Sequence, residues 1–110
     1  MDRMKRVNAL IKQEVADIIQ KKLDNANVGF ISITEVDVSK DLRNAKVYYS
    51  QIGSVEEKEA TFTALKKTAK FIKGELGRVL RMKNIPDLFF VFDDSIEKGV
   101  DMVNKINNLS

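Results

Sequence analysis

Apolar side chains recur at every third or fourth position across residues 3–23, and this spacing predicts an amphipathic helix. Residues 30–38 and 45–52 alternate instead and are rich in β-branched side chains, so both are predicted strands. The short polar link between them makes the two strands antiparallel neighbours. Unbroken alternation places Ile33 on the opposite face of the first strand from Val36.

A helical spacing of apolar residues continues through residues 55–83. A straight helix of that length would measure about 43 Å, whereas a compact chain of 110 residues has a diameter of roughly 34 Å. We therefore expect a break, either near Thr68, a poor helix former, or at Gly74 and Gly77. The apolar spacing runs through both places and does not choose between them.

Pro86 closes the helical region, and residues 87–92 form a third predicted strand. Apolar residues occupy both faces of this strand, which predicts a central position in the sheet. Residues 94–97 fit a capping box that opens a last helix. The element order predicts one α+β domain over residues 1–110, with a three-stranded sheet and helices packed on one of its faces.

The composition excludes several classes of chemistry. The chain has no cysteine and no histidine, so disulfides, thiol catalysis, the usual zinc sites and any histidine base are excluded. No apolar run resembles a signal peptide or reaches the length of a membrane span. Asp93 and Asp94 are adjacent carboxylates at a strand end, where aspartate most often forms a turn or cap. We therefore predict no enzyme activity, no catalytic residue, no metal and no cofactor.

Charge is distributed unevenly along the chain. Residues 66–83 hold seven of the 19 basic residues and only one acid, while the rest of the chain is mildly acidic. Steps of 4, 3 and 8 place Lys66, Lys70, Lys73 and Arg81 on one side of a helix, away from its apolar side. A cationic face of this kind suits a polyanion such as RNA, although an ordinary solvated helix surface has a similar composition.

Three weaker features bear on the same function. The G-x-x-G motif at Gly74–Gly77 resembles the phosphate-binding loop of KH domains, but Leu76 within it continues the apolar stripe. Tyr48 and Tyr49 on the second strand and Phe89 and Phe90 on the third have rings that can stack on bases, yet most of these four rings should belong to the core. Arg3 and Arg6 open the first helix and extend the basic surface.

The segment Thr34–Leu42, followed by Ala45–Ser50, resembles bacterial ribosome-binding factor A. Arg6, Val7 and Glu14 in the first helix match as well. The late segments Arg81–Lys83, Pro86–Phe90 and Asp93–Ile96 match in the same order. The similarity extends from about Arg3 to Leu109.

This resemblance implies a KH-like fold of type II, in the order α-β-β-α-α-β with a C-terminal helix. Members of the family bind the small ribosomal subunit and its rRNA, assist its late maturation, support growth in the cold and are not enzymes. It implies a cytoplasmic protein that is a monomer when free and has no membrane partner. Many relatives carry a longer C-terminal tail, and we expect functions tied to that tail to be missing.

In the family, a kink between two helices, usually written Ala-x-Gly, replaces the G-x-x-G loop. The matching residues here are Thr68, Ala69 and Lys70, so a lysine stands where glycine is usual. The resemblance therefore places the break at Thr68–Lys70 and leaves Gly74 and Gly77 inside the second helix.

The basic surface as a whole supplies the predicted RNA contacts, which are Arg3, Arg6, Lys66, Lys70, Lys73, Arg78, Arg81 and Lys83. The leading hypothesis is an assembly factor for the small ribosomal subunit. One alternative is a general single-stranded nucleic-acid binder with a KH-like fold. Another is a protein-interaction module whose basic face meets an acidic partner.

Overall fold

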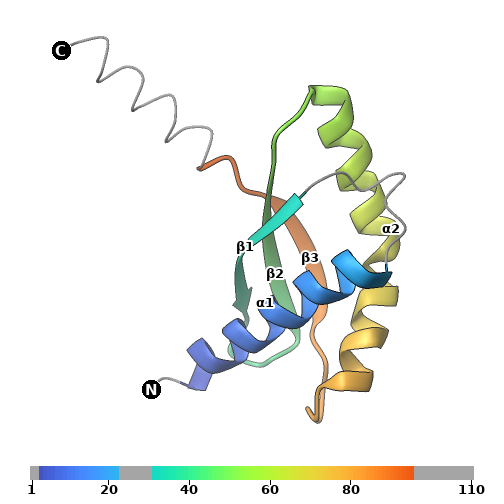
Figure 1. Cartoon of the computed structure of the whole chain (residues 1–110). Helices are drawn as coiled ribbons and strands as arrows, with labels where there is room; N and C mark the ends of the chain where they lie inside the picture. Colours follow the sequence, from blue (N-terminus) through green and yellow to red (C-terminus); the bar gives the residue numbers. More distant parts are fainter. Residues whose placement is uncertain (1–2, 23–30, 96–110) are drawn as a thin grey trace, which may run out of the picture.

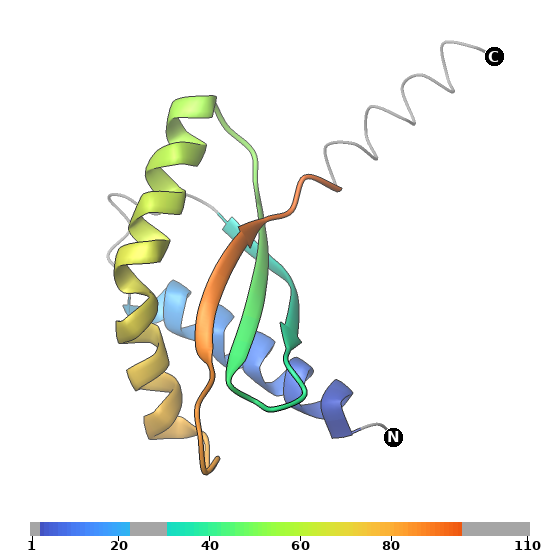
Figure 2. The same cartoon turned by 180° about the vertical axis from the view of Figure 1, so that it is seen from behind.

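Two helices lie on the same face of a three-stranded sheet in the computed structural model, which describes residues 3–22 and 31–95 (Figure 1). The elements, in chain order, are α1 (Arg3–Lys22), β1 (Ile31–Val38), β2 (Asn44–Gln51), α2 (Val55–Val79) and β3 (Asp87–Phe92). Seen from behind, the opposite face of the sheet carries no helix among the described residues (Figure 2). The predicted α+β class and the one-sided packing of helices are confirmed.

The sheet has the order β1-β2-β3, with β1 antiparallel and β3 parallel to β2. Parallel neighbours need a crossover connection, and α2 supplies it. The prediction that the third strand is central is therefore wrong, because β3 lies at an edge. Among the described residues no further layer covers its second apolar face, where the Phe89 side chain is 52% exposed. The antiparallel pairing of the first two strands is confirmed.

A β-bulge in β1 overturns the predicted alternation of that strand. The pairing with β2 shifts between Ile33 and Glu35, which leaves Thr34 as the extra residue. The shift brings Ile33 to the same face as Val36, where both pack in the core. A simple two-residue period cannot anticipate this change of face.

The helix α2 runs unbroken from Val55 to Val79, so the predicted break at Thr68–Lys70 into two helices is wrong. Ser54 caps its start: the Glu57 backbone N–H donates to Ser54 Oγ at 3.1 Å, and Ser54 N–H donates to Glu57 Oε1 at 3.2 Å. Thr68 Oγ1 donates to the Ala64 carbonyl at 2.9 Å, a bond that can bend a helix without ending it. At 25 residues the helix measures about 38 Å.

Both glycines of the G-x-x-G motif are helical, as predicted, and neither has a positive φ. The Gly74–Gly77 segment is therefore a part of α2 and not a phosphate-binding loop. The last predicted helix beyond Ser95 and half of its capping box, residues 96–97, lie outside the described residues.

The core forms between the inner faces of α1 and α2 and one face of the sheet. Its fully buried side chains come from each of these layers and include Ile11, Val15, Val47, Tyr49, Leu65, Ile72 and Leu76. Phe62 and Val79 share the apolar spacing predicted for residues 55–83, but they are exposed, at 38% and 55%. Neither described helix is long and apolar enough to cross a membrane.

Candidate nucleic-acid interface

Three lysines form a row along α2, which we call the lysine row: Lys66, Lys70 and Lys73. Their steps of four and three residues place them on one side of the helix, as the sequence predicts. Lys66 and Lys70 are exposed. The Lys66 ammonium lies 5.5 Å from the centroid of the Phe62 ring, a cation–π distance. The lysine row therefore offers two solvated cations on the side of α2 that faces β3.

Lys73 differs from the other two because it has a partner. Its Nζ lies 2.6 Å from Asp87 Oδ1, at the start of β3. The two side chains are 40% and 62% exposed, so water screens the pair and it contributes little to stability. The carboxylate nevertheless cancels much of the local field of Lys73.

Arg81 and Lys83 do not lie on the helix, so the prediction that Arg81 shares a helical side with the lysine row is wrong. The helix ends at Val79, and Leu80 takes an extended conformation after its N–H donates to the Leu76 carbonyl at 2.8 Å. Leu80 is buried and anchors the turn, while Arg81 and Lys83 are exposed beyond it.

The structure brings the start of α1 to this same segment. Arg3, Arg81 and Lys83 line one concave site of about 370 Å³, together with Leu42 from the turn between β1 and β2. We call these three cations the basic end. The sequence proposed Arg3 as an extension of the basic surface, and the fold places it beside Arg81 and Lys83, 78 or more positions away in the chain.

The turn from β1 to β2 adds a cation that the sequence analysis missed. Arg43 lines a neighbouring concave site with Lys73, and both sites share Leu42 and Asn84. The Asp87 N–H donates to the Arg43 carbonyl at 2.8 Å, which pins this turn to the start of β3. No local pattern signals the contact, because it depends on β3 pairing with β2 in parallel.

Besides Asp87, a second carboxylate, Asp41, lies within this basic region. Ser39 Oγ donates to Asp41 Oδ1 at 2.6 Å, and the Arg43 backbone N–H donates to the same oxygen at 3.0 Å. These bonds, the Ser39 hydroxyl first, lower the pKa of Asp41 below its usual value. Asp41 is therefore ionised at neutral pH, and because it lines both concave sites it places a negative charge among their cations.

Arg6 and Arg78 are exposed but line neither concave site. Arg78 Nη1 lies 3.7 Å from Glu75 Oε1 one turn earlier on α2. The structure thus groups three of the eight predicted residues into the lysine row and four into neighbouring concave sites. The two groups overlap at Lys73, and Arg6 and Arg78 lie apart from both.

The aromatic residues divide between the two faces of the sheet. Tyr49 and Phe90 are buried and meet edge to face, with ring centroids 6.4 Å apart. Tyr48 and Phe89 belong to the opposite, open face, where Phe89 is half exposed. The expectation that most of these rings are core residues holds for Tyr49 and Phe90 only.

The carboxylates at the end of β3 have a structural role. Thr34 Oγ1 donates to Asp93 Oδ2 at 2.7 Å, and the Ser95 N–H donates to Asp93 Oδ1 at 3.0 Å. Asp93 thus forms a turn, as its type and position predict. Within residues 3–22 and 31–95, no group of three acidic, cysteine or histidine side chains is placed to hold a metal ion.

Comparison with known proteins places the chain in a family. The sequence model described as ribosome-binding factor A matches residues 3–106. The chain belongs to the ribosome-binding factor A family. Ribosome-binding factor A of Acetivibrio thermocellus is 45% identical, covering 100% of this chain and 90% of the relative. That of Staphylococcus epidermidis is 44% identical, covering 97% and 89%.

Solved structures of ribosome-binding factor A share the fold. The crystal structure from Thermus thermophilus has a TM-score of 0.73 at 25% identity and covers 81% of this chain and 93% of its own. Coordinates of the Thermus thermophilus protein fitted into a cryo-EM map of a 30S complex have a TM-score of 0.66 at 25% identity, covering 79% and 91%. The family is one of ribosome-binding factors and not of enzymes, which confirms both the resemblance and the predicted non-enzymatic class.

Proposed function

We propose that this protein binds the small ribosomal subunit through its rRNA and assists late maturation of that subunit, including during growth in the cold. Membership of the ribosome-binding factor A family supports the proposal, as does the Thermus relative fitted into a 30S complex. The observation that carries it is the convergence of Arg3, Arg81 and Lys83 at the basic end. A ribosomal partner would place this protein in the cytoplasm, and we propose that it is a monomer when free.

The basic end and the lysine row suit phosphate contacts more than base recognition. Their exposed cations sit on long side chains, and such contacts fix position and orientation on RNA without reading its sequence. Specificity for the subunit would then come from the shape of folded rRNA, matched by cations from α1, α2 and the two connecting segments. Arg43 and the lysine row extend this surface across the turn between β1 and β2.

We propose that the protein acts by binding its rRNA site and occupying it during maturation. Binding energy from the phosphate contacts stabilises one rRNA conformation while neighbouring segments mature, and no covalent bond is made or broken. A ligand shifts a conformational equilibrium only by its differential affinity for the two states. The protein must therefore bind immature subunits more tightly than mature ones, and this difference releases it at the end.

Co-sedimentation tests the proposal. Immature small subunits, mature small subunits and a free single-stranded RNA of matched length are each mixed with the protein at several salt concentrations. We expect the order of affinity immature, then mature, then free RNA, and a slope of log affinity against log salt of roughly −4 to −5 if about five phosphates are neutralised. Equal affinity for subunits and free RNA would indicate a general single-stranded RNA binder instead.

A further inference from the structure

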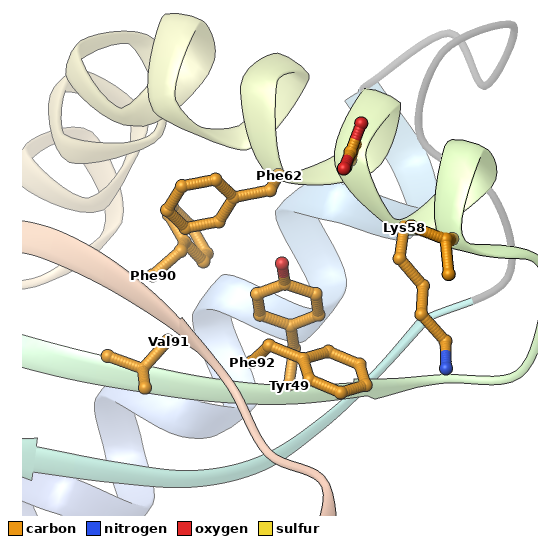
Figure 3. A pocket seen from close by; sticks show the side chains of 8 residues that line it. Tyr49, Lys58, Phe62, Phe90, Val91 and Phe92 are labelled. Atoms are coloured by element: carbon orange, nitrogen blue, oxygen red, sulfur yellow. The ribbon is translucent and has the colours of Figure 1, made fainter.

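The concave site at the basic end differs in composition from the one between α2 and β3. Aromatic rings surround the latter, and among the described residues Lys58 is its only cation (Figure 3). The site at the basic end combines three cations with apolar side chains. Its lining comes from the start of α1, the turn between β1 and β2, and the segment after α2, which lie at the same end of the molecule in both views (Figure 1, Figure 2).

The apolar part of this lining lies deeper than the charged part. Val7, Leu42 and Met82 are partly buried and pack against the core, whereas the three cations of the basic end are exposed. We call these three apolar residues the apolar floor, with the cations at its rim. The site measures about 370 Å³, near the lower end of the range of roughly 300–1,000 Å³ that small-molecule sites occupy. Its size therefore suits a single nucleotide and not a duplex.

Leu42 adopts a backbone conformation that is strained for a leucine. Its φ is 62°, the one positive value at a non-glycine position in the described part of the chain. The Leu42 N–H donates to the Ser39 carbonyl at 2.9 Å, which closes the turn in this conformation. Glycine would relieve the strain but would remove a side chain from the apolar floor. Strain of this kind is concentrated at binding sites, and here it accompanies a side chain that lines one.

The rim also carries a fixed hydrogen-bond acceptor. Asp41 Oδ1 accepts from Ser39 Oγ at 2.6 Å and from the Arg43 backbone N–H at 3.0 Å, and Oδ2 takes part in neither bond. Asp41 lines the same site as the apolar floor. A carboxylate accepts from the exocyclic amino groups of adenine, cytosine and guanine. Uracil offers it only one N–H, between two carbonyl oxygens that it repels.

We propose that this site receives one unpaired nucleotide of an RNA, with the base on the apolar floor and the adjoining phosphates among the rim cations. The nucleotide site rests on the proposed function, because RNA must first reach the basic end. A base inside a duplex cannot enter, since its faces are stacked and its pairing edge is occupied. The site therefore recognises an extruded or single-stranded nucleotide as one feature of the shape of folded rRNA, and Asp41 favours a base with an amino group.

NMR titration of the full chain with RNA pentanucleotides tests the proposal. The probes have uridine at the outer positions and adenosine, uridine or an abasic sugar at the centre, so all carry the same phosphates. The adenosine probe should bind at least about tenfold more tightly than the abasic probe, because only it buries a base. It should also shift the methyl resonances of Val7, Leu42 and Met82, which the abasic probe leaves within the range of a salt control. Uridine at the centre should bind about threefold or more weakly than adenosine.

Two matched variants locate the base. Met82→Trp fills the apolar floor without changing charge, so it should weaken the adenosine probe by about tenfold and the abasic probe by less than about twofold. Leu10→Trp, at a residue of α1 that is 44% exposed and does not line the site, should change neither. A circular dichroism spectrum confirms that both variants fold.

A third variant tests the role of Asp41. Asp41→Asn keeps an oxygen for the bonds from Ser39 and Arg43 but replaces the other carboxylate oxygen with an amide donor. The preference for adenosine over uridine at the centre should therefore fall below about twofold. An unchanged preference would remove Asp41 from the site.

Three further results would overturn the nucleotide site. The first is equal affinity for the adenosine and abasic probes, and the second is an equal effect of Met82→Trp and Leu10→Trp. The third is a shift of the floor methyl groups by free AMP at the same concentration as the pentanucleotide, or by an oligoglutamate peptide, which would assign the site to a free nucleotide or an acidic protein. Co-sedimentation with small subunits is scored separately: subunit binding that persists in any of these cases leaves the proposed function intact, and its absence in the unchanged protein contradicts that function itself.

Discussion

Lys73 Nζ lies 2.6 Å from Asp87 Oδ1, and this contact joins the lysine row of α2 to the first residue of β3. It also makes the three lysines unequal. Lys66 and Lys70 present their charge to solvent, whereas the charge of Lys73 is partly cancelled by a neighbouring carboxylate. The sequence spacing treats the three as equivalent, and only the pairing of β3 with β2 reveals the difference.

This inequality gives a prediction for subunit binding. Lys66→Gln should reduce the slope of log affinity against log salt by about 1, whereas Lys73→Gln should reduce it by clearly less, because Lys73 is already paired. Asp87→Asn should raise affinity at low salt, since it releases the charge of Lys73. Co-sedimentation across a salt series measures all three. Equal losses for both lysine variants would show that the contact with Asp87 does not persist in solution.

The helical glycines of α2 give a prediction for stability. A methyl group at Gly74 would meet nothing within 4 Å, and one at Gly77 would lie 3.6 Å from Ile85 Cγ1, an ordinary contact. Each Gly→Ala change should therefore raise the free energy of unfolding by about 0.5–1 kcal/mol, measured by urea denaturation. Destabilisation together with weaker RNA binding would instead indicate a loop at Gly74–Gly77.

A buried polar pair gives a prediction of lower stability on substitution, opposite to the gain expected at the glycines. Gln51 Nε2 donates to Thr61 Oγ1 at 2.8 Å, and both residues are at least 95% buried. Gln51 Oε1 has no partner among the described residues. Thr61→Val should cost about 1–3 kcal/mol of unfolding free energy because it leaves the Gln51 amide unsatisfied. Adding Gln51→Leu to Thr61→Val should recover much of that loss, and failure to recover it would mean that Gln51 stabilises the fold by its shape.

The turn at Asp93 makes stability depend on acid pH. Hydrogen bonds from the Ser95 hydroxyl and backbone N–H, and then from Thr34, lower the pKa of Asp93 below its usual value of 3.8. The unfolded chain therefore takes up this proton first as the pH falls. Asp93 should stabilise the fold above pH 3.8 and lose that contribution as the pH drops through its lower, folded pKa.

Urea denaturation between neutral pH and pH 3 measures this effect. The fall in unfolding free energy at acid pH should be smaller in Asp93→Asn than in the unchanged protein, with Asp41 supplying part of the dependence that remains. An identical pH profile for the two proteins would rule out the hydrogen-bonded carboxylate. Thr34→Val should show an intermediate profile because it removes one of the bonds.

Periodicity predicted the helices and strands because each one keeps a single apolar face. Ile11, Val15, Leu65, Ile72 and Leu76 are all buried on the helical sides that their spacing indicates. The third strand was predicted within its observed bounds because Pro86 marks its start. The element order predicted the helices on one face of the sheet, and the family resemblance added the KH-like type of the fold.

The errors arise where a long-range contact overrides a local pattern. The bulge at Thr34 depends on how β1 pairs with β2, and no residue type next to it in the sequence predicts it. The exposed Phe89 gave β3 the apolar pattern of a central strand, although it faces solvent at an edge. Arg43 joins the candidate interface only because parallel pairing brings Asp87 beside it. The Thr68 hydroxyl donates a hydrogen bond to the Ala64 carbonyl within α2, and the helix does not end there.

The central claim is that the basic end and the lysine row bind rRNA of the small subunit. Its most direct test compares two charge-matched variants, both folded, for co-sedimentation with immature small subunits. One carries Gln at Lys66, Lys70 and Arg81, and the other carries Gln at the exposed Lys12, Lys21 and Lys46, which lie on other elements or on the open face of the sheet.

Both variants lose three positive charges, so they differ only in where those charges stood. We expect the first to lose binding by at least about a hundredfold at moderate salt and to have a salt slope smaller by about 3, while the second binds within about threefold of the unchanged protein. Equal binding by the two variants would contradict the claim and show that net charge, or another surface of the molecule, holds the subunit.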